Sequence, residues 1–254
     1  MPEPIDIWAH RGGGLIAAQK YNFSPNSIES FEFALSNGSV GIETDVCLTN
    51  DNEPIVYHPG TLSPCPITMK WTECHLKYPE LIHLQDLFWY LIGVKLQCLL
   101  DIKVESKLLA EKMVDLIDEA ELFETVYLTA PRLKIPSVGL GVSPSSLQYA
   151  KSLDSRIKIH IIDALPFNIA KTFTKFNANK VSFGWTNDSK LSGRVFDMIF
   201  YKKMLRQLIK TQLADKYTLA GIVRHEKDVR YLMTCTDGLI KGIMTDDPEI
   251  TKTA

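Results

Sequence analysis

Short apolar runs alternate with amphipathic segments along the whole chain, and this alternation predicts strands that are mostly followed by helices. A well-marked helix begins near Asn26, a capping residue, and ends at Gly38. The other predicted helices are residues 107–120, 145–153, 167–176, 195–213 and 227–234. The strand candidates are residues 5–9, 41–48, 96–104, 125–130, 156–162, 180–185, 217–223 and 242–245.

Strands that alternate with helices predict an α/β protein with a parallel sheet. At 254 residues, a single closed (β/α)₈ TIM barrel is the natural form of such a sheet, and a doubly wound open sheet is the alternative. No linker, internal repeat or low-complexity tract divides the sequence. We therefore expect residues 1–254 to form one domain.

Composition narrows the classes of partner. A hydrophobic content of 45% and a charged content of 23% are ordinary for a soluble protein. The net charge of −2 argues against a nucleic-acid partner or an anionic membrane surface, so attraction for an anionic small molecule must be local. Nothing in the sequence indicates the oligomeric state.

Cysteine usage and the apolar segments bear on the compartment. The five cysteines form no CxxC pair, which favours reduced thiols over disulfides or a zinc site. The first residues lack the pattern of a signal peptide. The most apolar stretch, residues 87–100, is too short to span a bilayer and contains Lys95 and Gln97. We expect a cytoplasmic protein without a transmembrane segment.

The first strand candidate leads into a group of residues suited to an anion. In IWAHRGGG (residues 7–14), a histidine and an arginine follow the apolar run, and three glycines allow the chain to turn tightly beside a ligand. His10 and Arg11 would then lie on the rim of the sheet as a base and a cation. The alternative is a solvated pair at an ordinary strand end.

The second strand candidate carries two acidic residues on one face. Glu43 and Asp45 are two positions apart in GIETDVCL, so both project from the same side. The sequence TNDNEP that follows predicts a turn. A hairpin about the midpoint of residues 51 and 52 would bring His58 opposite Asp45. The alternatives are a solvated strand face and a loop histidine before Pro59.

The third strand candidate includes LLDIKV (residues 99–104), an apolar run that contains Asp101 and Lys103. Buried charges need a partner or a metal ion, and three carboxylates at one end of neighbouring strands suit a divalent Mg²⁺ or Ca²⁺ ion. With that ion, Arg11 and Lys103 would leave the site one positive charge, which suits a phosphodiester monoanion. A structural ion pair between Asp101 and Lys103 is the alternative.

The ordered set of these motifs resembles the glycerophosphodiester phosphodiesterase family, which is related to phosphodiesterases of the phosphatidylinositol phospholipase C type. The motifs are, in order, H-R-G, P-N-S, E-T-D-V, T-x-D-x-x-P-I-V-Y-H, D-I-K and I-M-T-D-D-P. They are dense over residues 7–103 and 242–248. The resemblance implies a (β/α)₈ barrel, one divalent cation, and hydrolysis of small glycerophosphodiesters, such as glycerophosphocholine, to glycerol 3-phosphate and an alcohol.

The resemblance also implies roles for individual residues. Two histidines would act as general acid and base, two cations would bind the phosphate, and three carboxylates would bind the metal. Asp101 stands where the family usually has glutamate, so its shorter side chain would reach the metal through water. The implied catalytic residues are His10 and His58, the phosphate-binding residues Arg11 and Lys103, and the metal ligands Glu43, Asp45 and Asp101.

Other departures from the family pattern concern the substrate more than the chemistry. The family's P-E-N-T is S-P-N-S here, which places Pro25 beside the site, and its H-D pair is His58-Pro59. The late W-T-V-N segment has become A-G-I-V-R, residues 220–224. Among the tryptophans, Trp185 at the end of a strand candidate is the one expected in a substrate pocket.

Three alternatives to this function stay open from the sequence. The loop between Gly12 and Ser24 carries Tyr21 and Phe23 as a candidate apolar lip, which would favour a phospholipase or lysophospholipase on the same barrel. The departures could instead mark a catalytically impaired barrel that serves as a binding protein. The third alternative is an unrelated metal-dependent barrel enzyme that acts on sugar phosphates.

Overall fold

The computed structural model describes residues 5–132, 144–163, 166–184, 203–212, 214–236 and 238–251. Eight parallel strands close into a barrel because the first strand pairs with both the second and the last. The predicted closed barrel is therefore confirmed, and the open sheet is excluded. The barrel strands are β1 (Asp6–Ala9), β2 (Gly41–Leu48), β4 (Gln97–Ile102), β5 (Val126–Pro131), β6 (Lys158–Asp163), β7 (Lys180–Gly184), β8 (Tyr217–Val223) and β9 (Gly242–Thr245).

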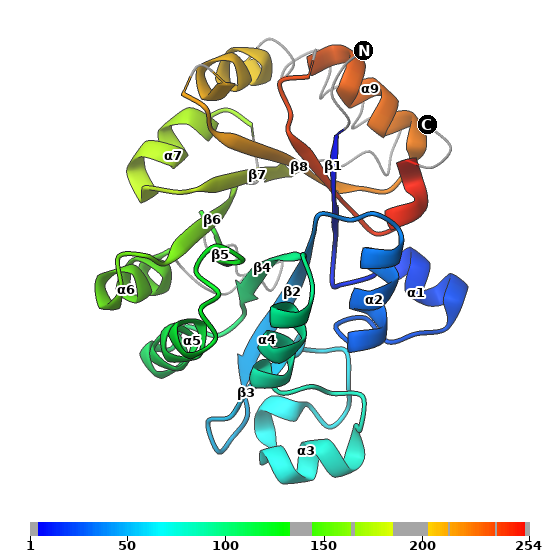
Figure 1. Cartoon of the computed structure of the whole chain (residues 1–254), viewed down its shortest axis with the longest axis vertical. Helices are drawn as coiled ribbons and strands as arrows, with labels where there is room; N and C mark the ends of the chain where they lie inside the picture. Colours follow the sequence, from blue (N-terminus) through cyan, green and yellow to red (C-terminus); the bar gives the residue numbers. More distant parts are fainter. Residues whose placement is uncertain are drawn as a thin grey trace.

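Helices surround this barrel, as Figure 1 shows. Residues 203–212 are helical as well, and short 3₁₀ turns span Pro66–Thr68 and Pro248–Thr251. Among the residues that the structure describes, no helix combines the length and the hydropathy that a membrane crossing needs. The labelled helices are α1 (Leu15–Tyr21), α2 (Ile28–Ser36), α3 (Trp71–Lys77), α4 (Leu84–Gly93), α5 (Lys107–Glu119), α6 (Ser145–Leu153), α7 (Ile169–Phe176) and α9 (Glu226–Thr236).

Two apolar layers hold the barrel together. The outer layer joins the strands to the helices and includes Ile42, Leu100 and Leu128. The inner cluster contains Trp8, Leu99, Tyr127, Leu219 and Met244. Side chains alternate across a strand, so residues two positions further along β1 and β4 are His10 and Asp101, on the same inward face. The inner apolar layer therefore lies directly below the polar carboxyl ends of the strands, where barrel enzymes carry their sites.

A short antiparallel strand, β3 (Pro54–Val56), extends the barrel sheet next to β2. Val46 pairs with Val56, so the hairpin is centred on residue 51 rather than between residues 51 and 52, and the backbone N–H of Tyr57 donates to Asp45 O at 2.9 Å. The turn closes on Thr49 and Glu53, with Asn52 in the left-handed region at φ 66°. The predicted pairing of Asp45 with His58 was therefore wrong by one position, and His58 lies just beyond the end of β3.

The start of α2 also differs from the prediction. Its N-cap is Ser27, which accepts a hydrogen bond from the Ser30 N–H, and Ser30 completes the capping box. Asn26 instead has φ 61° and points its side chain at the barrel, where Nδ2 donates to Asp45 Oδ2 at 3.0 Å. Thr44 Oγ1 donates to Asn26 Oδ1 at 2.7 Å. The side chain of Asn26 therefore binds a carboxylate of the candidate site and does not cap the helix.

The predicted apolar lip does not form. Residues 15–21 are helix α1, and Phe23 is buried in a small cluster with Ala17 and Ala18. Tyr21 is half exposed, but its ring lies 4.9 Å from that of Phe33 and its hydroxyl donates to Glu249. The backbone N–H groups of Ile16 and Ala17 donate to Asp246 O, so the start of this helix is held against the end of β9.

Candidate active site

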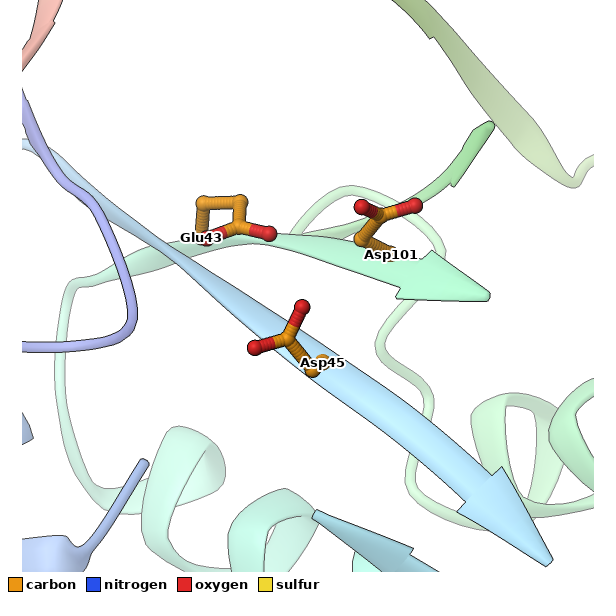
Figure 2. Close-up of side chains that lie close together, drawn as sticks. All are labelled: Glu43, Asp45 and Asp101. Carbon is orange, nitrogen blue, oxygen red and sulfur yellow. The ribbon is translucent and has the colours of Figure 1, made fainter. Parts of the chain in front are cut away.

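Three acidic side chains converge inside the carboxyl end of the barrel. Glu43 and Asp45 lie on β2, and Asp101 lies on β4 at the position paired with Asp45. One oxygen from each carboxylate lies within 4.8 Å of the others, and Figure 2 shows the three groups reaching toward the same space. All three residues are almost completely buried. The strand register therefore builds a compact oxygen-rich cluster, as the phase of the sequence predicts.

Lys103 lies between two of these carboxylates. Its ammonium is 2.9 Å from Asp45 Oδ1 and also donates to Asp101 Oδ2. Burial alone would lower the pKa of Lys103, but the charges of Asp101, Asp45 and Glu43 raise the pKa above its ordinary value. Lys103 therefore carries a fixed positive charge at the floor of the site.

The three carboxyl groups have different affinities for a proton. Burial and the neighbouring charge of Asp45 raise the pKa of Glu43 to about 7. Burial also raises the pKa of Asp101, against the opposing effect of Lys103. For Asp45, burial is outweighed by the charges of Lys103, His58 and Arg11, and its pKa is lowered. Asp45 is therefore the firmly ionised member of the cluster, and a further cation would stabilise the other two as carboxylates.

These residues fit a divalent cation. Oδ1 of Asp101 is buried and has no hydrogen-bond partner among the described residues, and Oδ1 of Asp45 contacts only the Lys103 ammonium there. Hard divalent cations prefer carboxylate oxygens of this kind. The acidic cluster is thus compatible with Mg²⁺ or Ca²⁺ held by Glu43, Asp45 and Asp101.

The turn after β1 places Arg11 over the same cluster. Arg11 adopts φ 51°, and its backbone N–H donates to Glu43 Oε2 at 3.0 Å, while its Nε lies 3.5 Å from Asp45 Oδ2. Glycine is required next to it, because a Cβ on Gly12 would lie 2.3 Å from the Ser30 hydroxyl and φ there is +81°. The glycine run therefore lets the chain turn against α2 and point the guanidinium into the barrel mouth.

His10 is held on both sides by carboxylates. Its Nδ1 lies 2.6 Å from Asp246 Oδ1, and its Nε2 lies 3.7 Å from Glu43 Oε2. Burial opposes protonation, but the hydrogen bond to Asp246 and the charges of Glu43 and Asp246 outweigh it, so the pKa of His10 is raised. Nδ1 is engaged by Asp246, which leaves Nε2 as the atom that faces the acidic cluster.

Asp246 is the residue that the sequence reasoning missed. It directly follows β9, and its second oxygen accepts a hydrogen bond from Arg224 Nε at 2.7 Å. Burial acts to raise the pKa of Asp246, yet the contacts with His10 and Arg224 hold it at about 2. The sequence does contain a signal for this residue, because Asp246 belongs to the I-M-T-D-D-P motif that contributes to the family resemblance.

His58 lines the same cavity as His10 and Arg11. Burial lowers the pKa of His58. The charge of Asp45 acts to raise this pKa, but the charges of Arg11 and Lys103 act with burial to lower it. Its Nδ1 is buried without a hydrogen-bond partner among the described residues. Unlike His10, this imidazole has no carboxylate bonded to Nδ1 within the described part of the chain.

A cavity of about 390 Å³ opens above the cluster and is the space available to a substrate. Trp185, the predicted pocket tryptophan, lies outside the described residues. The described polar side chains that line the cavity are His10, Arg11, Glu43, His58, Asp101, Lys103, Ser182 and Arg224. Six of the seven remaining predicted site residues thus surround one cavity, and Asp45 lies in contact with them through Lys103 and Arg11.

Solved structures of low sequence identity share this fold. A glycerophosphodiester phosphodiesterase from Parabacteroides distasonis superposes with a TM-score of 0.72 at 15% identity and covers 98% of this chain and 95% of its own. The enzyme of that name from Thermotoga maritima gives 0.70 at 14% identity, with 99% and 98% covered. A phosphodiesterase from Oleispira antarctica, solved with the product sn-glycerol-3-phosphate, gives 0.68 at 15% identity, with 98% and 95% covered.

Sequence comparison finds one family model that matches part of the chain. No curated protein matches the chain significantly. Residues 10–124 match the model described as the glycerophosphoryl diester phosphodiesterase family, and this range contains every described residue assigned to the site from the sequence. This part of the chain is therefore similar in sequence to the glycerophosphoryl diester phosphodiesterase family.

Proposed function

We propose that this protein hydrolyses small glycerophosphodiesters, such as glycerophosphocholine, to glycerol 3-phosphate and an alcohol. The observation that supports this proposal is the meeting of two imidazoles, two cations and three carboxylates at one cavity on the barrel rim. A divalent ion would leave the three carboxylates with one negative charge, and Arg11 and Lys103 would then give the site a net charge of +1. The charges of Asp246 and Arg224 cancel each other. A substrate phosphate with one negative charge suits that balance.

Arg11 and Lys103 would bind the phosphate and stabilise the charge that grows on its oxygens as the bond to the attacking group forms. One Mg²⁺ or Ca²⁺ ion, held by Glu43, Asp45 and Asp101, would supply Lewis-acid stabilisation of the phosphate. Because Lys103 already contacts two of these carboxylates, it would keep them oriented toward the ion.

His10 and His58 would move the protons. One imidazole takes the proton of the attacking hydroxyl, which belongs to water or to the glycerol part of the substrate, and the other gives a proton to the leaving alcohol oxygen. If the glycerol hydroxyl attacks, a cyclic phosphate forms, and water opens it with the roles of the histidines exchanged. Asp246 would act as a positioning residue, since its contact with Nδ1 directs Nε2 of His10 into the cavity.

Three wider features belong to the same proposal. Cys47, Cys65, Cys74 and Cys98 are free thiols among the described residues, which supports a reducing compartment such as the cytoplasm. Residues 1–254 would act as one domain on one barrel. The burial of Phe23 gives no support to a lipid-binding lip, so deacylated diesters are favoured over phospholipids.

Product identification tests this function. Purified protein is incubated with glycerophosphocholine and Mg²⁺ or Ca²⁺, and the products are followed by ³¹P NMR. We expect glycerol 3-phosphate and choline. Phosphocholine and glycerol as products would place bond cleavage on the other side of phosphorus. Absence of any turnover would favour the impaired-barrel alternative.

A further inference from the structure

A second cavity adjoins the catalytic one. It has a volume of about 180 Å³ and shares Arg11, Leu15 and His58 with the larger cavity. Its other walls come from the turn before α2, from the end of β3 and from the segment between β3 and α4. The phosphate that Arg11 binds would therefore lie at the junction of the two cavities, and one of its ester groups would enter the smaller one.

Most of the polar groups in the walls of this smaller cavity are already used by the protein. The side chain of Asn26 is bonded to Asp45 and Thr44. The hydroxyl of Tyr57 accepts from the backbone N–H groups of Gly60 and Leu62, at 3.1 and 3.3 Å. The hydroxyl of Thr61 donates to His58 O at 2.9 Å. A hydroxyl-rich ligand would thus find few partners there.

Apart from Arg11 and His58, the surface that remains for a ligand is apolar, with the side chain of Ser24 and one acidic group. Glu80 is exposed at the cavity and has no hydrogen-bond or ion-pair partner among the described residues. A volume of 180 Å³ is below the roughly 300–1,000 Å³ of pockets for drug-sized molecules, so a group of a few carbon atoms fits and a long acyl chain does not. The apolar lining residues are Leu15, Pro25, Val56, Leu62 and Leu81.

We propose that this smaller cavity is the subsite for the alcohol part of the diester, and that it selects compact alkyl or alkylammonium alcohols over polyhydroxylated or anionic ones. This inference rests on the proposed function. The glycerol part would occupy the larger cavity, which Ser182 and Arg224 line. Polyhydroxylated alcohols would lose hydrogen bonds to water without replacing them, and Glu80 would attract an ammonium group and repel a carboxylate.

The selectivity is measured as kcat/KM on four substrates: the glycerophosphate diesters of choline, propanol, inositol and serine. In the wild type we expect the choline and propanol esters to exceed the inositol and serine esters by at least about tenfold, the cost of leaving one or more polar groups unpaired. Equal or better turnover of the inositol ester would overturn the inference while the proposed function stands.

A charge variant tests the role of Glu80. Glu80→Gln should raise KM for the choline ester about two- to fivefold, as expected for an exposed ion pair, and leave the propanol ester unchanged. The matched control is Glu32→Gln, which removes an exposed carboxylate on the outer face of α2 and should alter neither ester. An equal effect of Glu80→Gln on both esters would contradict the proposed selection by charge.

The pocket can be tested separately from turnover. Dissociation constants of the four diesters are measured calorimetrically with the wild-type protein in the presence of chelator. We expect the same ranking in affinity as in kcat/KM. If no diester is turned over, the proposed function fails, and equal affinities in this experiment would then overturn the subsite as well.

Discussion

Nδ1 of His10 lies 2.6 Å from Oδ1 of Asp246, although 236 positions separate the two residues in the sequence. The barrel brings them together, because β1 and β9 pair in parallel and Ala9 is opposite Thr245. Each residue therefore stands one position beyond the last pair of its strand. Closure of the barrel thus completes a contact between a proposed catalytic imidazole and a buried carboxylate.

The first prediction concerns this contact. Asp246→Asn should lower kcat at least about tenfold with little change in KM, because part of the 10²–10⁴-fold contribution of a positioned acid or base is lost. Asp247→Asn is the matched control, since its carboxylate accepts from the Glu249 N–H rather than from His10. Steady-state kinetics of both variants provide the measurement. An unchanged kcat for Asp246→Asn, with the control equally active, would contradict the positioning role.

The two histidines give a second prediction. His10→Ala and His58→Ala should each lower kcat by about 10² to 10⁴, because each removes one proton-transfer group. Thermal unfolding followed by circular dichroism should show little change in Tm for His58→Ala, which removes no hydrogen bond of Nδ1. A near-native rate in either variant would exclude the two-histidine scheme.

A third prediction concerns Asp101, the candidate metal ligand that stands where the resembled family usually has glutamate. Asp101→Asn should raise the Mg²⁺ or Ca²⁺ concentration needed for half-maximal activity, because an amide oxygen carries no charge for the ion. Asp101→Glu should be tolerated, since its extra methylene restores direct reach. Titration of activity with each metal, together with calorimetric metal binding, compares the variants. Equal metal dependence in Asp101→Asn and the wild type would remove Asp101 from the site.

Stability at acidic pH gives a fourth prediction, on a group below the site. His160 is fully buried on β6, and burial together with the charge of Lys180 lowers its pKa to about 3. Between the pKa of an unfolded histidine, about 6.5, and the folded value, only the unfolded state binds the proton, so the free energy of unfolding falls as pH falls. In His160→Gln this dependence is absent, because glutamine does not bind a proton in this pH range.

Urea unfolding of both proteins at two pH values tests the role of His160. The free energy of unfolding of the wild type, relative to His160→Gln, should decrease by about 2 kcal/mol between pH 6.5 and 5, at about 1.4 kcal/mol per pH unit. A relative stability that does not change over this window would show that His160 titrates alike in both states.

The order of the barrel strands, and their bounds to within two residues, could be predicted from the sequence, because each is a short apolar run between turn signals. Helix α4 was missed, because LFWYLIG is apolar almost throughout and such runs do not separate helix from strand by periodicity. Its cap is also unusual: His83 rather than serine or threonine accepts the capping hydrogen bond. The sequence predicts a loop between Gly12 and Ser24, and the structure forms helix α1 within it.

Much of the candidate site could be predicted for a related reason. Glu43, Asp45 and Asp101 meet because strand phase and parallel register fix where their side chains point. The contact of His10 with Asp246 depends on barrel closure, which no local pattern encodes. The hairpin register depended on Asn52 in the left-handed region, and a shift of one residue cannot be seen in the hydrophobic pattern of so short a strand.

The most direct test of the central claim is the hydrolysis of glycerophosphocholine by the purified wild-type protein, measured before and after treatment with a chelator. The account predicts release of glycerol 3-phosphate at millimolar Mg²⁺ or Ca²⁺, loss of that activity in the chelator, and its return when the metal is restored. Hydrolysis that continues undiminished in the chelator, or no hydrolysis with either metal, would contradict a metal-assisted two-histidine phosphodiesterase.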